Sequence, residues 1–128
     1  MQVLLDTHLL LWAAYEPGRL SPHLTAVIDN PAHEVYFSAA SIWEVAIKAS
    51  LGREDFAVNP QVLRRGLLAN GYRELSVTAE HAAAVYDLPA LHRDPFDRIL
   101  VAQSRTEGIP LLTVDPALQR YGVAAIAD

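Results

Sequence analysis

Short apolar segments alternate along this chain with helix-like segments, and this alternation most limits the folds open to it. Strands that alternate with helices pair in parallel, because each helix returns the chain to the same end of the sheet. We therefore expect an α/β fold with three layers, α/β/α, around a mostly parallel sheet of four to five strands. The strand order is left open by the pattern. The predicted strands are 3–5, 34–37, 72–77 and 109–114, with 123–126 as a candidate fifth. The predicted helices are 7–15, 22–30, 38–51, 60–70, 78–88 and 95–108, with a last helical turn from residue 115.

The length and composition favour one soluble domain. A chain of 128 residues is long enough for a real core and too short for two domains, so we expect a single domain over residues 1–128. The longest apolar run, residues 9–15, has seven residues, whereas a membrane-spanning helix needs about 20. The N-terminus lacks the pattern of a secretory signal, and the chain has no cysteine for disulfides. We expect a cytoplasmic protein without a membrane segment.

Four acidic residues stand where predicted strands give way to helices: Asp6, Glu44, Asp97 and Asp115. Because the carboxyl ends of parallel strands line one edge of a sheet, where ligands bind, we expect these side chains to share a pocket. Clustered carboxylates repel each other, which raises the pKa of some of them unless a cation is bound. The pattern therefore predicts a divalent-metal site. Metal-dependent phosphodiester hydrolysis is the chemistry that most often uses one.

Each of these acids also has a structural explanation. Aspartate is among the best N-cap residues, and three aspartates directly precede predicted helices: Asp6, Asp94 and Asp115. Asp97 would complement the helix dipole in a first turn. Ser41 and Glu44 match a capping box, and Glu44 makes a favourable i,i+4 pair with Lys48. For a single residue both explanations stay open, and the functional one depends on the joint pattern.

The net charge of −5 is unfavourable for a nucleic-acid-binding protein, which usually shows a basic face. Nine of the ten basic residues are arginines, so a phosphate-binding surface would have to be a local arginine patch. Arg93, Arg98 and Arg105 flank the segment that contains Asp94 and Asp97. The alternative is that these arginines are solvated helix faces.

The segment Asp6-Thr7-His8 raises a second enzymatic possibility. An Asp-x-His after a strand is also how dinuclear metallophosphoesterases begin, but those enzymes need further histidines in a Gly-Asn-His-type motif to complete their metal shells. The remaining histidines stand in no such motif: His23, His33, His81 and His92. We therefore interpret His8 as a helix-face residue or a neighbour of a site ligand.

Four segments resemble, in chain order, the signature segments of PIN domains, and the closest branch is the toxin of bacterial VapBC-type toxin–antitoxin modules. They are residues 4–8 (Leu-Leu-Asp-Thr-His), 38–44 (Ser-Ala-Ala-Ser-Ile-Trp-Glu), 92–98 (His-Arg-Asp-Pro-Phe-Asp-Arg) and 112–115 (Leu-Thr-Val-Asp). The resemblance covers nearly the whole chain. The Asp-Pro-Phe-Asp-Arg block together with the N-terminal Asp-Thr-His is specific to one branch of the family.

This resemblance implies a Mg²⁺- or Mn²⁺-dependent endoribonuclease that a cognate antitoxin neutralises. The family's acidic quartet, which would hold one or two ions, is matched by Asp6, Glu44, Asp97 and Asp115. Asp94 belongs to the extended motif of the branch and is a further candidate metal ligand. Ser41 and Thr113 match small hydroxyl positions near the family's site. The candidate substrate-binding residues are Arg93, Arg98 and Thr113.

Partner binding is expected from the apolar helices as well as from the resemblance. The helices carry more large apolar residues than one small sheet face absorbs, among them Leu9, Leu10, Leu11, Trp12, Trp43 and Ile47. A contiguous apolar surface of this kind usually marks a protein interface. We expect a homodimer that binds RNA and a small antitoxin. A non-catalytic module that binds the antitoxin and acts as a co-repressor is the alternative from another class.

Overall fold

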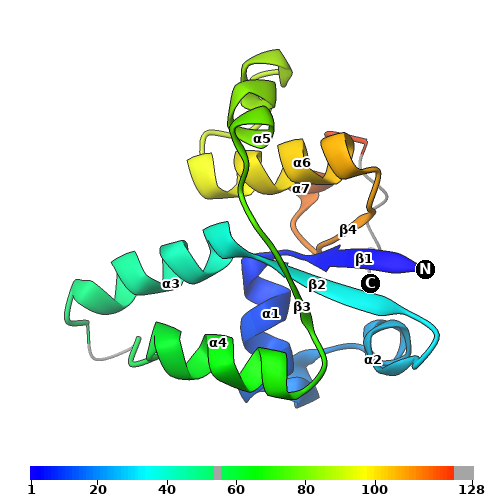
Figure 1. Cartoon of the computed structure of the whole chain (residues 1–128), viewed down its shortest axis with the longest axis vertical. Helices are drawn as coiled ribbons and strands as arrows, with labels where there is room; N and C mark the ends of the chain where they lie inside the picture. The colour runs from blue at the N-terminus through cyan, green and yellow to red at the C-terminus, as the bar shows by residue number, and fades with distance from the viewer. Residues whose placement is uncertain (54–55, 123–128) are drawn as a thin grey trace.

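The computed structural model describes residues 1–53 and 56–122, and its centre is a parallel sheet of four strands in the order β3-β2-β1-β4 (Figure 1). The strands are β1 (Gln2–Leu5), β2 (Glu34–Ser38), β3 (Arg73–Leu75) and β4 (Leu111–Leu112). The predicted α/β class with a parallel sheet is confirmed. The candidate fifth strand at 123–126 lies outside the described residues.

Helices cover both faces of the sheet. In Figure 1, α1, α2 and α4 lie below the sheet, α5, α6 and α7 lie above it, and α3 extends from the end of β2. The helices are α1 (Thr7–Tyr15), α2 (Pro22–Asp29), α3 (Ala39–Ser50), α4 (Pro60–Ala69), α5 (Ala79–Ala84), α6 (Pro95–Glu107) and α7 (Pro116–Gln119), with short 3₁₀ turns η1 (Pro17–Arg19) and η2 (Val85–Asp87). None of the helices in the described part of the chain is long and apolar enough to cross a membrane.

The alternation of side chains along β1 divides the core in two. Val3 and Leu5 pack into the cluster formed with α1, α2 and α4, whereas Leu4 packs into the cluster formed with α6 and α7. All three side chains are fully buried, because β1 lies between β2 and β4 and is covered by helices on both faces.

The register places the carboxyl ends of the strands at one edge. Leu5 of β1 pairs with Leu112 of β4, and the Asp6 N–H donates to the Leu112 carbonyl at 3.1 Å. Asp6 and Thr113 therefore leave the sheet side by side. On the other side of β1, β2 leads directly into α3. The first turns of α1 and α3 and the turn before α7 are thus brought to the same edge.

Two predicted strands, one predicted helix and one predicted helix cap differ from the structure. The helix predicted over 78–88 is α-helical only over Ala79–Ala84 (α5) and continues as the 3₁₀ turn η2. β3 and β4 are shorter than 72–77 and 109–114. For β4, Pro110 has no N–H for the ladder, and the Thr113 hydroxyl accepts from Asp115 N instead of continuing the strand. The predicted capping box at Ser41 and Glu44 is wrong, because α3 already begins at Ala39 with Ser38 as its cap.

Candidate metal centre

Asp6 combines a helix cap with a position at the edge of the sheet. Its Oδ1 accepts from the Leu9 N–H at 2.8 Å at the start of α1, as the N-cap explanation predicted. The side chain is only 2% exposed. Burial raises the pKa of Asp6, and the negative charge of Asp115 adds to this; the hydrogen bonds from Leu9 and from the Thr113 hydroxyl act in the opposite direction. Asp6 therefore has both a structural contact and an electrostatic link to a second acid.

Glu44 lies on the buried face of α3, and its two carboxylate oxygens have different surroundings. Oε2 is 2.8 Å from Lys48 Nζ, which confirms the expected i,i+4 pair. Oε1 is buried and has no hydrogen-bond partner among residues 1–53 and 56–122, and the side chain as a whole is 6% exposed. Buried polar atoms nearly always have a partner, so this oxygen calls for one that the protein does not supply.

Asp97 lies in the first turn of α6, and its Oδ2 is 2.9 Å from His92 Nε2. Burial is the main cause that raises the pKa of Asp97, to about 6, and the neighbouring charge of Asp94 is the next; His92 acts to lower it. Glu44 and Asp6 each raise it further. The charges of Glu44 on α3 and of Asp6, the N-cap of α1, therefore act on Asp97 across the edge of the sheet.

Asp115 completes the group from the other side of β1. Its Oδ1 caps α7 by accepting from the Ala117 N–H at 2.9 Å, and its Oδ2 is 3.6 Å from His92 Nε2. His92, Asp97 and Asp115 each offer one ligand atom within 4.8 Å of the other two. His92 is not among the site residues that the sequence predicts. The available signal was its place in the segment that leads to Asp97.

Three buried hydroxyl groups, those of Thr7, Ser41 and Thr113, make hydrogen bonds at this edge. Thr7 Oγ1 donates to Ser41 Oγ at 2.8 Å, which fixes the first turn of α1 against α3. Thr113 is fully buried, and its hydroxyl contacts both Asp6 and the backbone N–H of Asp115. Of the two small hydroxyls that the resemblance placed near the site, Thr113 therefore contacts two of its acids, whereas Ser41 contacts Thr7.

The remaining residues of the 92–98 segment are placed as follows. Asp94 caps α6, with Oδ1 accepting from the N–H groups of Phe96 at 2.8 Å and Asp97 at 3.3 Å. Arg98 directs its guanidinium to backbone carbonyls, those of Val85 at 3.2 Å and His92 at 3.3 Å among them. Arg93 is exposed. Substrate binding by these arginines stays a prediction, and the contacts of Arg98 give it a role in holding the loop.

The donor set suits a hard divalent cation. Such ions prefer carboxylate oxygens, and one buried oxygen of Glu44 has no other partner. A cation between the acids would also remove the repulsion that raises the pKa of Asp97. The residues present therefore fit a bound divalent ion.

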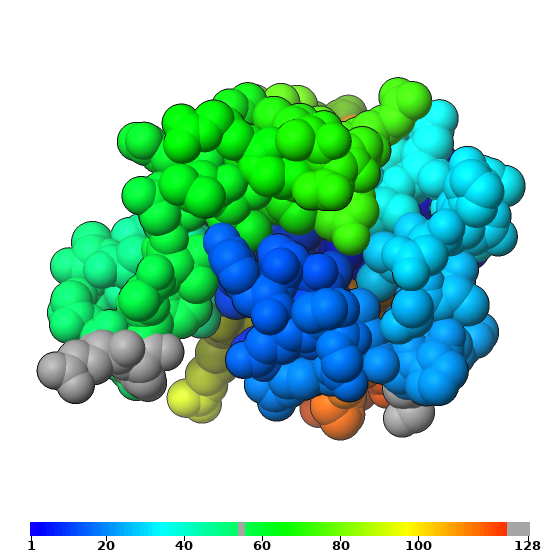
Figure 2. Space-filling model, turned by 90° about the horizontal axis from the view of Figure 1, so that it is seen from below, coloured from blue at the N-terminus to red at the C-terminus, as the bar shows by residue number. Residues whose placement is uncertain are grey.

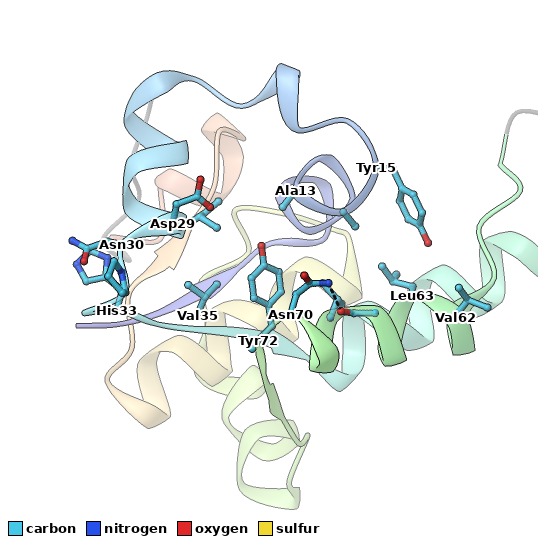
Figure 3. Close-up of a pocket in the computed structure, with 16 residues that line it drawn as sticks. Ala13, Tyr15, Asp29, Asn30, His33, Val35, Val62, Leu63, Asn70 and Tyr72 are labelled. Atoms are coloured by element: carbon cyan, nitrogen blue, oxygen red, sulfur yellow. Dashed lines mark hydrogen bonds between the residues drawn. The ribbon is translucent and has the colours of Figure 1, made fainter.

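Two hollows have linings that do not include the four acids Asp6, Glu44, Asp97 and Asp115. A groove of about 740 Å³ lies on the face of α1, α2 and α4, and its lining includes Tyr15, Asp29, His33, Leu63, Asn70 and Tyr72 (Figures 2 and 3). In Figure 3, Tyr72 stands between Asp29 at one end and Leu63 at the other. A second, mainly apolar cleft of about 750 Å³ lies between α3, α5 and α6 and is lined in part by Trp43, Val77, Val85, Phe96 and Ile99.

Comparison with known proteins shows the family of this chain. The PIN domain family matches residues 3–124. Ribonuclease VapC22 of Mycobacterium tuberculosis (strain ATCC 25618 / H37Rv) is 33% identical over 120 residues, which are 93% of this chain and 91% of that relative.

Two solved structures show the same fold. VapBC2 from Rickettsia felis, solved with a DNA fragment from the VapBC2 promoter, has a TM-score of 0.71 at 13% identity. The match covers 100% of this chain and 98% of that one. FitAcB from Neisseria gonorrhoeae has a TM-score of 0.66 at 21% identity, and the match covers 98% of this chain and 96% of that one. With the family match over nearly its whole length and its acids gathered at the carboxyl edge of the sheet, this chain belongs to the PIN domain family.

Proposed function

We propose that this chain is an endoribonuclease that hydrolyses RNA phosphodiester bonds with the help of Mg²⁺ or Mn²⁺. The observation that carries the proposal is the buried, unpartnered oxygen of Glu44 beside a carboxylate, Asp97, whose pKa is raised to about 6. The similarity to a protein named as a ribonuclease supports the reaction class. We expect the protein to act in the cytoplasm.

We assign four of the acids to binding the ion and the fifth, Asp94, to a structural role. Asp6, Glu44, Asp97 and Asp115 would hold one or two ions. When bound, such an ion lowers the pKa of a coordinated water and stabilises charge on the scissile phosphate. Asp94 already serves the N-terminus of α6, so we assign it to positioning Asp97 rather than to the ion. Arg93, which is exposed in the same segment, is the candidate contact for the RNA backbone.

Purified variants test the catalytic assignment. Asp6→Asn and Asp97→Asn should stop RNA cleavage in the presence of Mn²⁺, because each removes a charge but preserves shape. Asparagine at position 6 still accepts from the Leu9 N–H, so loss of activity cannot be traced to the helix cap. Asp29→Asn, an exposed aspartate at the end of α2, is the matched control and should cleave normally. A folded Asp97→Asn chain with wild-type cleavage would refute the site.

The ends of the RNA products test the metal mechanism separately. Attack by water activated on a metal should leave a 5′-phosphate and a 3′-hydroxyl. Attack by the RNA's own 2′-hydroxyl would leave a 2′,3′-cyclic phosphate. End-labelling distinguishes the two, and activity in excess chelator would also exclude the metal. A wild-type chain that cleaves no RNA with any divalent ion would favour the non-catalytic co-repressor.

We further propose that the two hollows serve protein partners. The relatives VapBC2 and FitAcB were solved as complexes, and we assign a cognate antitoxin to this chain in the same way. Leu9 and Leu10 are core residues, and Leu11 and Trp12 pack partly buried against the core, which leaves Trp43 (63% exposed) and Ile47 (37%) as the exposed members of the predicted apolar set. We assign the cleft beside Trp43 to pairing of two copies and the groove along α1, α2 and α4 to the antitoxin.

Inhibition and mass measurements test these partners. Excess cognate antitoxin should suppress RNA cleavage by the wild type. Substitution of Val62→Glu, an exposed residue in the lining of the groove, should relieve that suppression. Light scattering at micromolar concentration should give the mass of a dimer, and a monomer there would exclude the pairing assignment.

A further inference from the structure

His92 lies at the meeting point of two candidate ligands without being an obvious part of the acidic set. Its Nε2 is 2.9 Å from Asp97 Oδ2 and 3.6 Å from Asp115 Oδ2, and the imidazole is 21% exposed. By distance alone, His92 has the appearance of a third metal ligand. Whether Nε2 acts as a metal ligand or as a hydrogen-bond donor depends on which ring nitrogen carries the hydrogen, and the contact of Nδ1 shows this.

The backbone fixes which nitrogen of His92 carries the proton. The Asp94 N–H donates to His92 Nδ1 at 3.3 Å, so Nδ1 presents a lone pair and not a hydrogen. A neutral imidazole then carries its hydrogen on Nε2. Nε2–H is the group that faces Asp97 Oδ2, at a length suited to a hydrogen bond. A nitrogen that bears a hydrogen has no lone pair for a cation, so in this state His92 is a donor to the carboxylate.

The loop that carries His92 is itself held in place. Arg98 Nη1 donates to the His92 carbonyl at 3.3 Å, and Nη2 donates to the Val85 carbonyl at 3.2 Å and the Leu88 carbonyl at 3.5 Å. Arg98 follows Asp97 directly on α6. The helix that presents the carboxylate therefore also fastens the loop that presents the imidazole.

We propose that His92 is a positioning residue that holds Asp97 for cation binding. Its Nε2–H engages Oδ2 and fixes the rotation of the carboxylate, which leaves Oδ1 outside that hydrogen bond. Hydrogen bonds of this kind to ligating groups commonly set metal affinity, with losses of roughly 10- to 100-fold when they are removed. The inference rests on the proposed metal site, because the orientation of Asp97 matters only where a cation is bound.

Three variants distinguish the effect of the His92 N–H donor from the effect of the ring's shape. His92→Phe keeps a ring of similar shape without the N–H, whereas His92→Gln places an amide N–H close to the position of Nε2. His23→Phe, an exposed histidine on α2, is the matched control. Mn²⁺ affinity is measured by calorimetry on the metal-free proteins, after thermal melts have shown that each is folded. We expect roughly a 10- to 100-fold weaker affinity for His92→Phe, substantial recovery for His92→Gln and no change for His23→Phe.

Imidazole ¹⁵N spectra of the wild type, with and without Mg²⁺, give a readout that does not depend on activity. We expect the His92 hydrogen to stay on Nε2 in both states. Loss of that hydrogen on addition of Mg²⁺ would make His92 a direct ligand and overturn the proposal. Equal Mn²⁺ affinity in His92→Phe and wild type would overturn it as well, with the metal site intact. A wild type that binds no Mn²⁺ would instead refute the proposed function, and this role with it.

Discussion

Glu44 is paired with Lys48 through one carboxylate oxygen, while its other oxygen is buried without a hydrogen-bond partner. The Lys48 side chain is 47% exposed, so the pair reaches from the surface toward the interior. An unpartnered buried oxygen on a charged group is unfavourable, because the free energy of its lost hydration is not recovered. A cation at this position would remove that cost.

The first prediction concerns metal-dependent stability. Mn²⁺ that binds only the native chain raises its free energy of unfolding by about 2.7 kcal/mol at a hundredfold excess over the dissociation constant. We expect a higher melting temperature with Mn²⁺ for the wild type and little or no shift for Glu44→Gln. Differential scanning fluorimetry measures both. Glu80→Gln, an exposed acid in the first turn of α5, should respond like the wild type, and a wild-type melt insensitive to Mn²⁺ would argue against a shared pocket.

The second prediction concerns the pH dependence of the metal-free chain. The pKa of Asp97 is raised from 3.8 to about 6, mainly by burial and then by Asp94, with Glu44 and Asp6 adding to it and His92 opposing it. Between these two values the native state binds more protons than the unfolded state, so the stabilising contribution is present at low pH and is lost as pH rises through about 6. We expect a loss on the order of 1 kcal/mol between about pH 5 and pH 7.

Urea denaturation in the presence of chelator measures this effect, with Asp97→Asn as the reference because its side chain does not titrate. The difference in stability between the two chains should change with pH in the stated direction, the wild type losing relative to the variant as pH rises. Parallel pH profiles would show that Asp97 is not the group responsible.

Local sequence rules anticipated much of this fold, since they depend on contacts between near neighbours. Caps by Asp6, Asp94 and Asp115 require only that an acid precede a helix, and the Glu44–Lys48 pair requires only helical spacing. The capping box was assigned to the wrong residues for a related reason. Ser41 matched the pattern but is one turn inside α3, where its hydroxyl bonds to Thr7, while a true capping box joins Thr78 and His81.

What the sequence left open depends on contacts between distant segments. The meeting of His92 with Asp115 depends on the place of β4 in the strand order, and the buried, unpartnered oxygen of Glu44 depends on how α3 packs against α4 and α6. Arg98 was a candidate for phosphate binding because charge alone suggested it. Its engagement by backbone carbonyls depends on the path of the loop after η2, which no local pattern encodes.

The third prediction concerns pairing of two copies through the cleft beside Trp43. The Trp43 ring packs edge to face on Phe96, with ring centroids 5.0 Å apart, yet most of its surface is exposed. Trp43→Glu should convert a dimer to a monomer, because it places a charge in an apolar interface. Light scattering gives the mass, and Leu68→Glu, an exposed apolar residue on α4 outside both hollows, should remain a dimer. A Trp43→Glu chain that is still a dimer would show that the interface does not include the cleft beside Trp43.

The fourth prediction concerns the fully buried side chain of Gln103. It accepts from Ser38 Oγ at 2.6 Å and donates to the Ser76 carbonyl at 3.3 Å, which joins α6 to the carboxyl ends of β2 and β3. Gln103→Leu leaves both partners without this contact, so we expect a loss of about 1–3 kcal/mol in the free energy of unfolding. Urea denaturation should show it, while Gln61→Leu at an exposed position of α4 should stay near the wild type.

In three of the acids at this edge, one carboxylate oxygen is already in contact with another group of the protein. Lys48 contacts one oxygen of Glu44, His92 contacts one oxygen of Asp97, and the Ala117 N–H engages one oxygen of Asp115. Carboxylates tethered in this way favour single-oxygen donation over chelation, so a six-coordinate ion would keep several positions for exchangeable water or phosphate. We therefore expect the occupancy of the site to follow the free cation concentration around the protein. RNA turnover would then be limited by the cell's supply of divalent metal as well as by the antitoxin.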